Sequence, residues 1–232
     1  MNISMSSLTF ISIILTIIVY LGARWLSIRV LSPFTTPVLT ATIVIILALH
    51  LMGISYEQYT PAKEWMTFLL GPATVALAVP MYHNRDVIME KLFPALFGLI
   101  IGTISTIISA VWLSKALGLS DTIQATSTVK AVTTPVAIEA VLLVGGDPSL
   151  AAAFVIIAGL FGAILAPLIL TITKISDPFS RGLGIGTVSH VIGTSQAVKE
   201  GPIQGAVSSM AMGCAAILTS IILPWLYPII QL

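Results

Sequence analysis

Residues 127–140 read STVKAVTTPVAIEA, and they place a cation, a carboxylate, four hydroxyls and a proline in an otherwise apolar chain. A charged side chain at the centre of a bilayer costs at least roughly 2.5–3.5 kcal/mol, so Lys130 and Glu139 need a partner or water there. Their spacing of nine residues puts them on opposite faces of a continuous helix. Pro135 lacks an N–H group and disfavours helix at Thr134, so the stretch predicts an interrupted helix that forms a polar site within a membrane.

The composition of the whole chain is that of a membrane protein. Of its 232 residues, 57% are hydrophobic and 8% are charged, whereas a soluble domain contains about 25% charged residues. At roughly 20 residues for each span, the chain has room for about seven to eight transmembrane segments and no separate soluble domain. We therefore expect an all-α polytopic membrane protein whose segments include discontinuous or re-entrant helices.

Several classes of function are excluded by composition and motif. The net charge of +1 without a basic patch argues against nucleic acid as a partner. The single cysteine, Cys214, excludes an internal disulfide and a cysteine-based metal cluster. The chain contains no H-E-x-x-H motif, nucleophile elbow or metal-ligand cluster, so we expect neither an enzyme nor a protein with a metal or organic cofactor.

The predicted organisation is a single integral membrane domain over residues 1–232. Arg24 and Arg29 follow the first apolar run, whereas a secretory signal places its charges before it, so a retained span with its N-terminus outside is expected. The expected parts are residues 1–30, a first span and a basic cytoplasmic loop; residues 31–124, a first broken-helix unit interrupted near Gly71-Pro72; and residues 125–232, a core with two polar broken segments.

The charged loops predict a topology, although the bias in charge is small. We expect the loop from His83 to Lys91 and the residue Lys199 on the cytoplasmic side, and Lys174 and Arg181 on the outer side. The stretch between Arg181 and Lys199 lies between these two groups of charges.

That stretch is the second polar insertion. Residues 181–197 read RGLGIGTVSHVIGTSQA, and no strand precedes the alternating glycines, so they do not form a dinucleotide fingerprint. Glycines and hydroxyls between two spans instead predict a broken helix near Gly186–Gly193 or close backbone packing. His190 and Thr194 are four residues apart and share a helical face. The alternative for His190 is a histidine that is hydrogen-bonded to a neighbouring helix.

A recurring pattern suggests internal repeats. A broken polar segment, a charged turn and a long span rich in small residues follow one another at 71–113, 133–173 and 184–224. Repeats with discontinuous helices place the substrate of many secondary transporters at the middle of the membrane. Whether these repeats are inverted or parallel is left open by the sequence.

Four motifs resemble the LrgB/CidB family: KAVTTPVAIE at 130–139, GLFGAILAP at 159–167, RGLGIGTVSHVIGT at 181–194 and LGPATVALAVPMY at 70–82. The resemblance covers residues 31–224. Bacterial members of that family were named as antiholin-like regulators of murein hydrolase export, and are usually encoded beside a small holin-like membrane protein, LrgA or CidA. Plant relatives are plastidic glycolate/glycerate translocators, and some bacterial pairs are linked to pyruvate transport.

The resemblance implies a multi-pass protein of the bacterial cell membrane with one of two functions. The leading hypothesis is a proton-linked secondary carrier for a small 2-oxo or 2-hydroxy monocarboxylate, because helix N-termini, hydroxyls and a lysine suit a carboxylate. The alternative is an antiholin-like scaffold that acts with an LrgA/CidA-type protein, in which Lys130 and Glu139 form a buried structural ion pair. We also expect contact with membrane lipid and a homo-oligomer.

The candidate site residues come from both polar segments. Glu139 and His190 are the candidates for proton coupling. The candidate substrate-binding residues are Lys130, Thr133, Thr134, Pro135, Glu139, His190, Gly193, Thr194 and Ser195.

Overall fold

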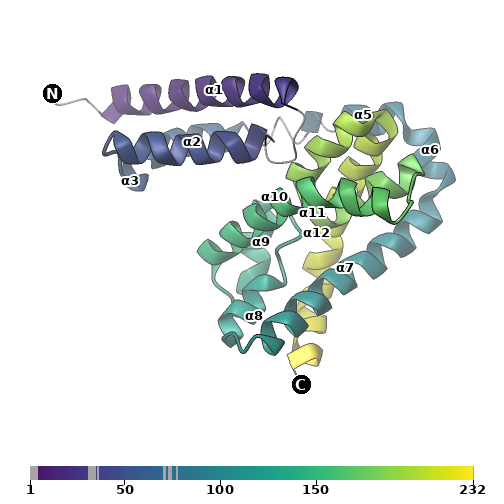
Figure 1. Ribbon diagram of the computed structural model, residues 1–232. Helices are drawn as coiled ribbons and strands as arrows, with labels where there is room; N and C mark the ends of the chain where they lie inside the picture. The colour runs from purple at the N-terminus through teal and green to yellow at the C-terminus, as the bar shows by residue number, and fades with distance from the viewer. Residues whose placement is uncertain are drawn as a thin grey trace. The chain divides into compact units, whose positions relative to one another are not determined.

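The computed structural model describes residues 5–30, 35, 37–69, 72, 75–76 and 78–231 (Figure 1). Within these residues the regular elements are helices and there is no strand. The prediction of an all-α membrane protein is therefore confirmed. The chain divides into two compact units, Met1–Ala76 and Leu77–Leu232, each of which is described by itself.

The first unit contains three described helices, α1 (Met5–Arg29), α2 (Pro37–Leu51) and α3 (Tyr56–Phe68). α1 packs against both of the others, and the hydroxyls of Thr16 and Tyr59 join α1 to α3 at 2.9 Å. A capping box starts α3: the Ser55 hydroxyl accepts from the backbone N–H of Gln58, and the Gln58 side chain accepts from the N–H of Ser55.

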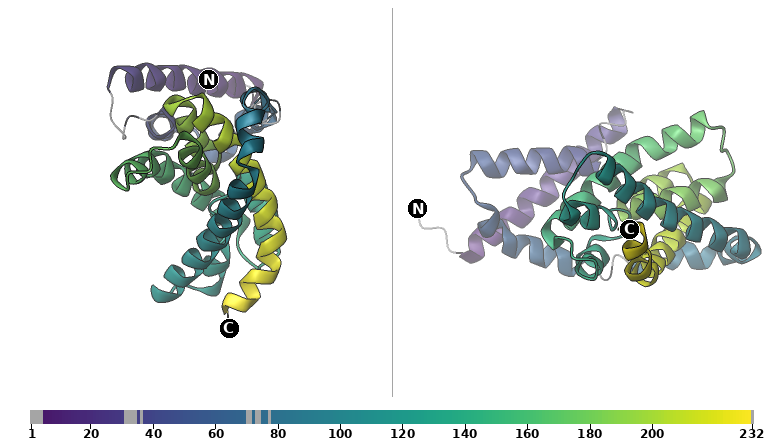
Figure 2. Two further views of the ribbon diagram at one scale, coloured as in Figure 1. Left: turned by 90° about the vertical axis from the view of Figure 1, so that its right-hand side faces the viewer. Right: turned by 90° about the horizontal axis from the view of Figure 1, so that it is seen from below.

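The second unit contains eight helices within the described residues: α5 (Ala78–His83), α6 (Arg85–Glu90), α7 (Leu92–Ala116), α8 (Asp121–Ser127), α9 (Thr134–Leu142), α10 (Pro148–Ile172), α11 (Pro178–Glu200) and α12 (Pro202–Gln231). α7 and α12 lie side by side (Figure 2). α11 packs against α10, α12 and α7, and contacts α12 most extensively.

Four of the described helices are long and apolar enough to cross a membrane: Ser7–Arg29, Leu92–Ala116, Pro148–Ile172 and Pro202–Gln231. The apolar helix Leu39–Leu51 is shorter. A helix of 25 residues, such as α7 or α10, is about 37 Å long and exceeds the roughly 30 Å hydrocarbon core. The chain is a multi-pass membrane protein.

Polar contacts define the two ends of the second unit. At one end, just before α7, Lys91 Nζ lies 3.4 Å from Asp177 Oδ1. At the other end, Lys115 Nζ near the end of α7 donates hydrogen bonds of 2.8 and 3.0 Å to the carbonyls of Ile230 and Gln231, where α12 ends. α7 and α12 therefore finish together. We call these the Asp177 end and the Lys115 end.

Candidate functional site

The opening polar stretch forms an interrupted helix. α8 ends at Ser127, short turns follow, and α9 starts after its N-cap residue Thr133, whose backbone is extended. Pro135 lies in the first turn of α9, where a missing N–H breaks no hydrogen bond. The break predicted near Thr133–Pro135 is confirmed.

This interrupted segment returns to the end of the unit at which it starts. Near its beginning, the Tyr227 hydroxyl of α12 donates a 3.4 Å hydrogen bond to the carbonyl of Asp121. Near its end, the backbone N–H of Asp147 donates to Thr126 Oγ1 at 2.9 Å, which brings the start of α10 beside the end of α8. Residues 121–147 thus enter from the Lys115 end and leave by it. We call them the α8–α9 segment.

Lys130 lies at the inner tip of the α8–α9 segment. Its ammonium donates a 2.9 Å hydrogen bond to the carbonyl of Thr106, and its side chain is half-buried. Thr106 is ten residues from the last residue of α7, or about 15 Å along the helix axis. Since α7 is about 37 Å long, the Lys130 ammonium lies near the middle of this helix.

Glu139 does not pair with Lys130. The ion pairs of the described residues join Arg85 to Asp86, Lys91 to Asp177 and Arg181 to Glu200, and Glu139 is exposed on α9. The hypothesis of a buried Lys130–Glu139 ion pair is therefore wrong for this structure. The physical reason is that the lysine finds a backbone carbonyl on α7, while the break turns the glutamate to the surface of α9.

The second polar insertion is also broken, at His190. Within α11 this residue has φ 40° and ψ −138°, a left-handed and non-helical conformation that is uncommon for a residue other than glycine. The break predicted near Gly186–Gly193 is confirmed. The imidazole is buried, and its Nε2 lies 2.9 Å from the carbonyl of Val155 on α10. The structure therefore shows the alternative that was given for His190, which is a histidine hydrogen-bonded to a neighbouring helix.

The break folds α11 back on itself. Arg181 and Glu200 lie at the two ends of α11, 19 residues apart, and would be about 28 Å apart on a straight helix. Instead they form a two-pronged ion pair, with Arg181 Nε 2.8 Å from Glu200 Oε2 and Arg181 Nη2 2.9 Å from Oε1. α11 is therefore a helical hairpin of two arms, 178–189 and 191–200, with His190 at its tip. We call it the α11 hairpin.

Contacts with α12 also show that the two arms run in opposite directions. Along the first arm, Gly182 faces Gln204 and Gly186 faces Ser208, so this arm runs parallel to α12. Along the second arm, Thr194 Oγ1 lies 2.9 Å from Ser208 Oγ and Val198 packs against Gly205, so it runs antiparallel. Close approach depends on glycine here, because a Cβ at Gly182 would lie 2.5 Å from the Gln204 carbonyl.

The α8–α9 segment and the hairpin together correct the predicted topology. Lys199 and Glu200 lie at the same end of the unit as Arg181, and Lys91 lies at that end through its contact with Asp177. The prediction that Lys91 and Lys199 lie opposite Arg181 is wrong. The α8–α9 segment returns to the end at which it starts, which places Arg181 at the same end as Lys91, and α11 reverses at His190, which brings Lys199 back to that end.

The two broken segments enter from opposite ends and meet near the middle of α7. On α7, Gly102 faces Thr187 near the hairpin tip, one turn from Thr106, which binds Lys130. On α10, Val155 binds His190 through its carbonyl, and its side chain packs in one core cluster with Val129 and Val132 of the α8–α9 segment. The segments are thus inverted relative to each other.

Several buried polar groups lie around these tips, although buried polar atoms without a partner also occur at Ser12 in α1 and Gln124 in α8. Thr194 is buried and donates to the carbonyl of His190 at 2.8 Å. The hydroxyls of Thr103 on α7 and Ser189 on the hairpin are buried and have no hydrogen-bond partner in the described structure. A buried hydroxyl without a partner costs roughly 1–3 kcal/mol, so these two hydroxyls are available to a polar ligand at the tips.

The structure groups the predicted site residues in two sets and separates two of them. The hairpin set is His190, Gly193 and Thr194, all buried, and the α8–α9 set is Lys130, Thr133, Thr134 and Pro135. Glu139 and Ser195 are exposed, and the Ser195 hydroxyl donates to the carbonyl of Ile192.

Sequence reasoning missed Thr103, Ser189 and Ser208. Ser189 immediately precedes His190, so the motif itself contained this signal. Thr103 and Ser208 lie within long apolar spans that contain several other hydroxyl residues, so the sequence does not single them out.

One further prediction concerns another part of the chain. The break expected near Gly71–Pro72 lies outside the described residues, apart from Pro72.

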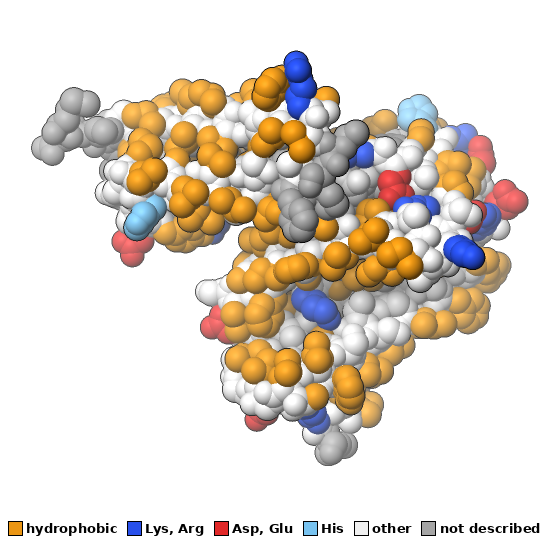
Figure 3. Space-filling model, viewed as in Figure 1, with side chains coloured by type: hydrophobic (Ala, Val, Ile, Leu, Met, Phe, Trp, Pro, Cys, Tyr) orange, Lys and Arg blue, Asp and Glu red, His pale blue; other side chains and the backbone are white. Residues whose placement is uncertain are grey.

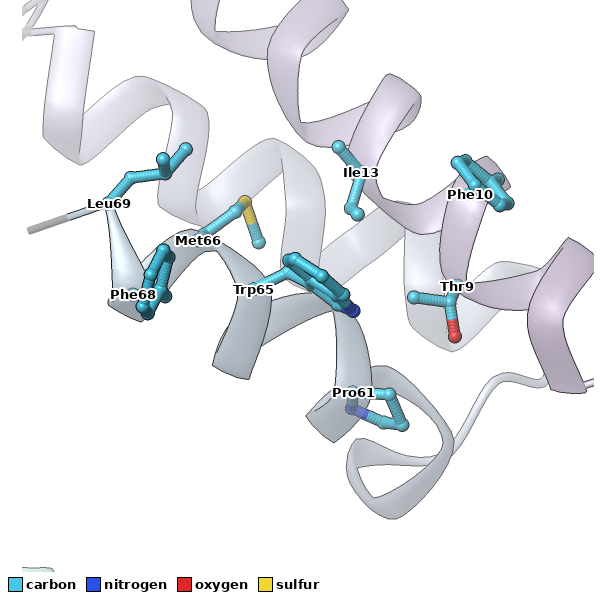
Figure 4. A pocket seen from close by; sticks show the side chains of 8 residues that line it. All are labelled: Thr9, Phe10, Ile13, Pro61, Trp65, Met66, Phe68 and Leu69. Carbon is cyan, nitrogen blue, oxygen red and sulfur yellow. The ribbon is translucent and has the colours of Figure 1, made fainter.

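The first unit contains an apolar pocket of about 530 Å³ between α1 and α3, where Trp65 and Phe68 lie opposite Phe10 and Ile13 (Figure 4). None of the predicted site residues lines this pocket. The described residues include no group of three or more histidine, cysteine or acidic side chains arranged for a metal ion.

Comparisons with known proteins agree over most of the chain. The model of the LrgB-like family matches residues 16–229. The uncharacterized proteins YxaC and YwbG of Bacillus subtilis are 38% and 35% identical, over 96% and 93% of this chain and 98% and 96% of their own lengths. The holin-like protein CidB of Staphylococcus aureus is 31% identical over 91% of this chain and 93% of its own length. No solved structure matches the chain.

Proposed function

Because this chain belongs to the LrgB-like family, we propose that it is an antiholin-like regulatory protein of the bacterial cell membrane. It acts with a small holin-like membrane protein to control murein hydrolase activity and lysis. The observation that carries the proposal is the 31% identity to the holin-like protein CidB, which extends over 91% of this chain. A match of this extent covers both polar segments as well as the apolar spans.

The surface of the protein suits contact with other membrane helices. Hydrophobic side chains cover much of the visible face (Figure 3). The exposed large apolar residues of the second unit include Phe97, Trp112, Phe161, Leu168, Ile217, Ile221 and Trp225. A surface of this kind accepts lipid chains or the helices of a partner equally well, and association in the membrane then depends on close packing.

The experiment is complementation of a bacterial strain that lacks its CidB-type protein. The chain is expressed alone, with a small holin-like protein of the LrgA/CidA type, or replaced by empty vector. We expect the rate of lysis and the murein hydrolase activity outside the cells to change only when both proteins are present, and the two to copurify from detergent. Unchanged lysis in cells whose membranes contain both proteins would reject the proposal.

A second candidate function is a proton-linked carrier for a small 2-oxo or 2-hydroxy monocarboxylate. The specific observation in its favour is the Lys130 ammonium near the middle of α7, at a break in a helix. The first turn of α9 offers free N–H groups and a partial positive charge, and the hydroxyls of Thr133 and Thr134 lie beside it. These groups suit a carboxylate and its neighbouring oxygen. For proton coupling the proposed groups are His190 and Glu139.

Uptake into vesicles tests the carrier. Labelled pyruvate, glycolate and lactate are offered to the unaltered protein, to Lys130→Met and to Lys115→Met. Both lysines donate to backbone carbonyls, but Lys115 lies at the end of α7, so its variant is the matched control. Loss of a buried counter-charge costs about 3–5 kcal/mol, which is two to four orders of magnitude in affinity. We expect that loss for Lys130→Met alone, and absence of uptake by the unaltered protein would reject the carrier.

A further inference from the structure

The two broken segments sort the connections of the second unit between its two ends. The α11 hairpin begins and ends at the Asp177 end, so the connections around residues 84–91, 173–181 and 199–202 all lie there. The α8–α9 segment begins and ends at the Lys115 end, which also contains the last residues of α12. These assignments rest on contacts within the second unit alone.

The cations of residues 77–232 are distributed unevenly between these ends. Lys130 lies within the unit and is left out of the comparison. The Lys115 end contains Lys115 alone. The Asp177 end contains five cations, which are Arg85, Lys91, Lys174, Arg181 and Lys199.

The two reversals together make this distribution uneven. If α11 alone crossed the membrane, Lys199 would move to the Lys115 end and the cations would divide four against two. If the α8–α9 segment crossed as well, Lys174 and Arg181 would lie opposite Lys91 and the division would be three against three. With both the α8–α9 segment and α11 reversed, they divide five against one. Short loops with an excess of lysine and arginine face the cytoplasm, so the division of five against one gives the clearest orientation.

We propose that the Asp177 end faces the cytoplasm. The α11 hairpin is then a re-entrant segment entered from the cytoplasm, and the α8–α9 segment is a re-entrant segment entered from outside. Each arm is long enough to bring its tip near the middle of the membrane, because the 12 residues of the arm 178–189 extend about 18 Å. As a consequence, the polar groups at His190 are nearest to the cytoplasm, those at Lys130 are nearest to the outside, and α12 ends outside. This sidedness is independent of which proposed function is correct.

Single-cysteine labelling tests the proposal. The variants are made in a Cys214→Ala background. Ser176→Cys lies just before the first arm of the α11 hairpin, and Pro202→Cys lies just after its second arm. Ser120→Cys and Ser149→Cys mark the Lys115 end. All four positions are exposed and none removes a charge. A membrane-impermeant maleimide is applied to intact and to permeabilised cells of a bacterium without an outer membrane. We expect residues 120 and 149 to react in intact cells, and residues 176 and 202 only after permeabilisation.

Two results would overturn the proposal. Reaction of residues 176 and 202 from opposite sides would mean that α11 crosses the membrane, and reaction of both from outside would mean that the orientation is reversed. Fusions to the C-terminus of the unaltered chain provide a second measurement that needs no cysteine variant to fold. Alkaline phosphatase is active only outside the cytoplasm, so its fusion to the C-terminus should be active. Green fluorescent protein fluoresces only in the cytoplasm, so its fusion should not fluoresce. An inactive phosphatase fusion together with a fluorescent green fluorescent protein fusion would also overturn the proposal.

Discussion

The ion pair that closes the base of the α11 hairpin is expected to hold the hairpin together. The side chains of Arg181 and Glu200 are 13% and 15% exposed. The guanidinium also donates to the carbonyls of Ile175 at 2.9 Å and Pro167 at 3.3 Å. Replacing Glu200 with glutamine keeps the shape of the side chain and removes its charge. The arginine is then left in a mostly buried place without its counter-ion.

The magnitude follows from this burial. Breaking a buried ion pair by removing one partner costs about 3–5 kcal/mol. The lower limit applies here, since two carbonyls still accept from the guanidinium. For a chain of this length, about 3 kcal/mol lowers the midpoint of thermal unfolding by roughly 6–12 °C. The double variant Arg181→Met with Glu200→Gln should recover most of that loss, because it leaves no uncompensated charge.

Thermal unfolding of the detergent-solubilised protein measures the effect. Lys91→Gln is the matched control, because it breaks the Lys91–Asp177 pair at the same end of the unit, whose side chains are 42% and 47% exposed. An exposed pair contributes about 0–1 kcal/mol, so the control should lose at most a few degrees. If Glu200→Gln and Lys91→Gln lower the midpoint equally, the ion pair does not hold the hairpin and the reasoning is refuted.

Three further predictions concern packing, pH and coupling. Gly162→Ala should destabilise the protein by about 1–3 kcal/mol, because its Cβ would lie 2.6 Å from Ser189 Cβ. Gly213→Ala, which has open space, should be neutral or stabilising by up to about 1 kcal/mol, and equal midpoints for the two variants would contradict this. The backbone N–H and hydroxyl of Ser180 and the nearby Lys91 hold the pKa of the Asp177 carboxyl below its ordinary 3.8. The ionised carboxylate therefore stabilises the fold above pH 3.8, and this stabilisation is lost as the pH falls through the lowered pKa. The difference in unfolding free energy between the unaltered protein and Asp177→Asn should shrink below about pH 4, and a difference that does not change with pH would contradict this prediction. Lys130→Met and Glu139→Gln should have additive effects on unfolding within about 0.5 kcal/mol, because the two side chains do not meet, and a coupling above 1 kcal/mol would restore the ion pair.

Composition and local backbone chemistry predicted the class of the protein and the positions of its breaks. A chain with 8% charged residues has no means of covering a soluble surface, so helices in a membrane follow. Pro135 and the glycines around His190 act on their own backbone and that of their neighbours. Such effects span only a few residues, and for this reason both breaks within the described residues lie where the sequence placed them.

The path of the chain after each break was decided only by tertiary structure. Whether α11 continues or reverses at His190 depends on contacts between Arg181 and Glu200, 19 residues apart. Lys130 donates to the carbonyl of a residue 24 positions away on α7. That helix contains no acidic side chain that would have pointed to the contact. A backbone carbonyl is present in every residue, so sequence does not single out the one that a lysine will reach. The class and the breaks are local properties, whereas the reversal, the partner of Lys130 and the outward position of Glu139 arise from packing among helices that are distant in sequence.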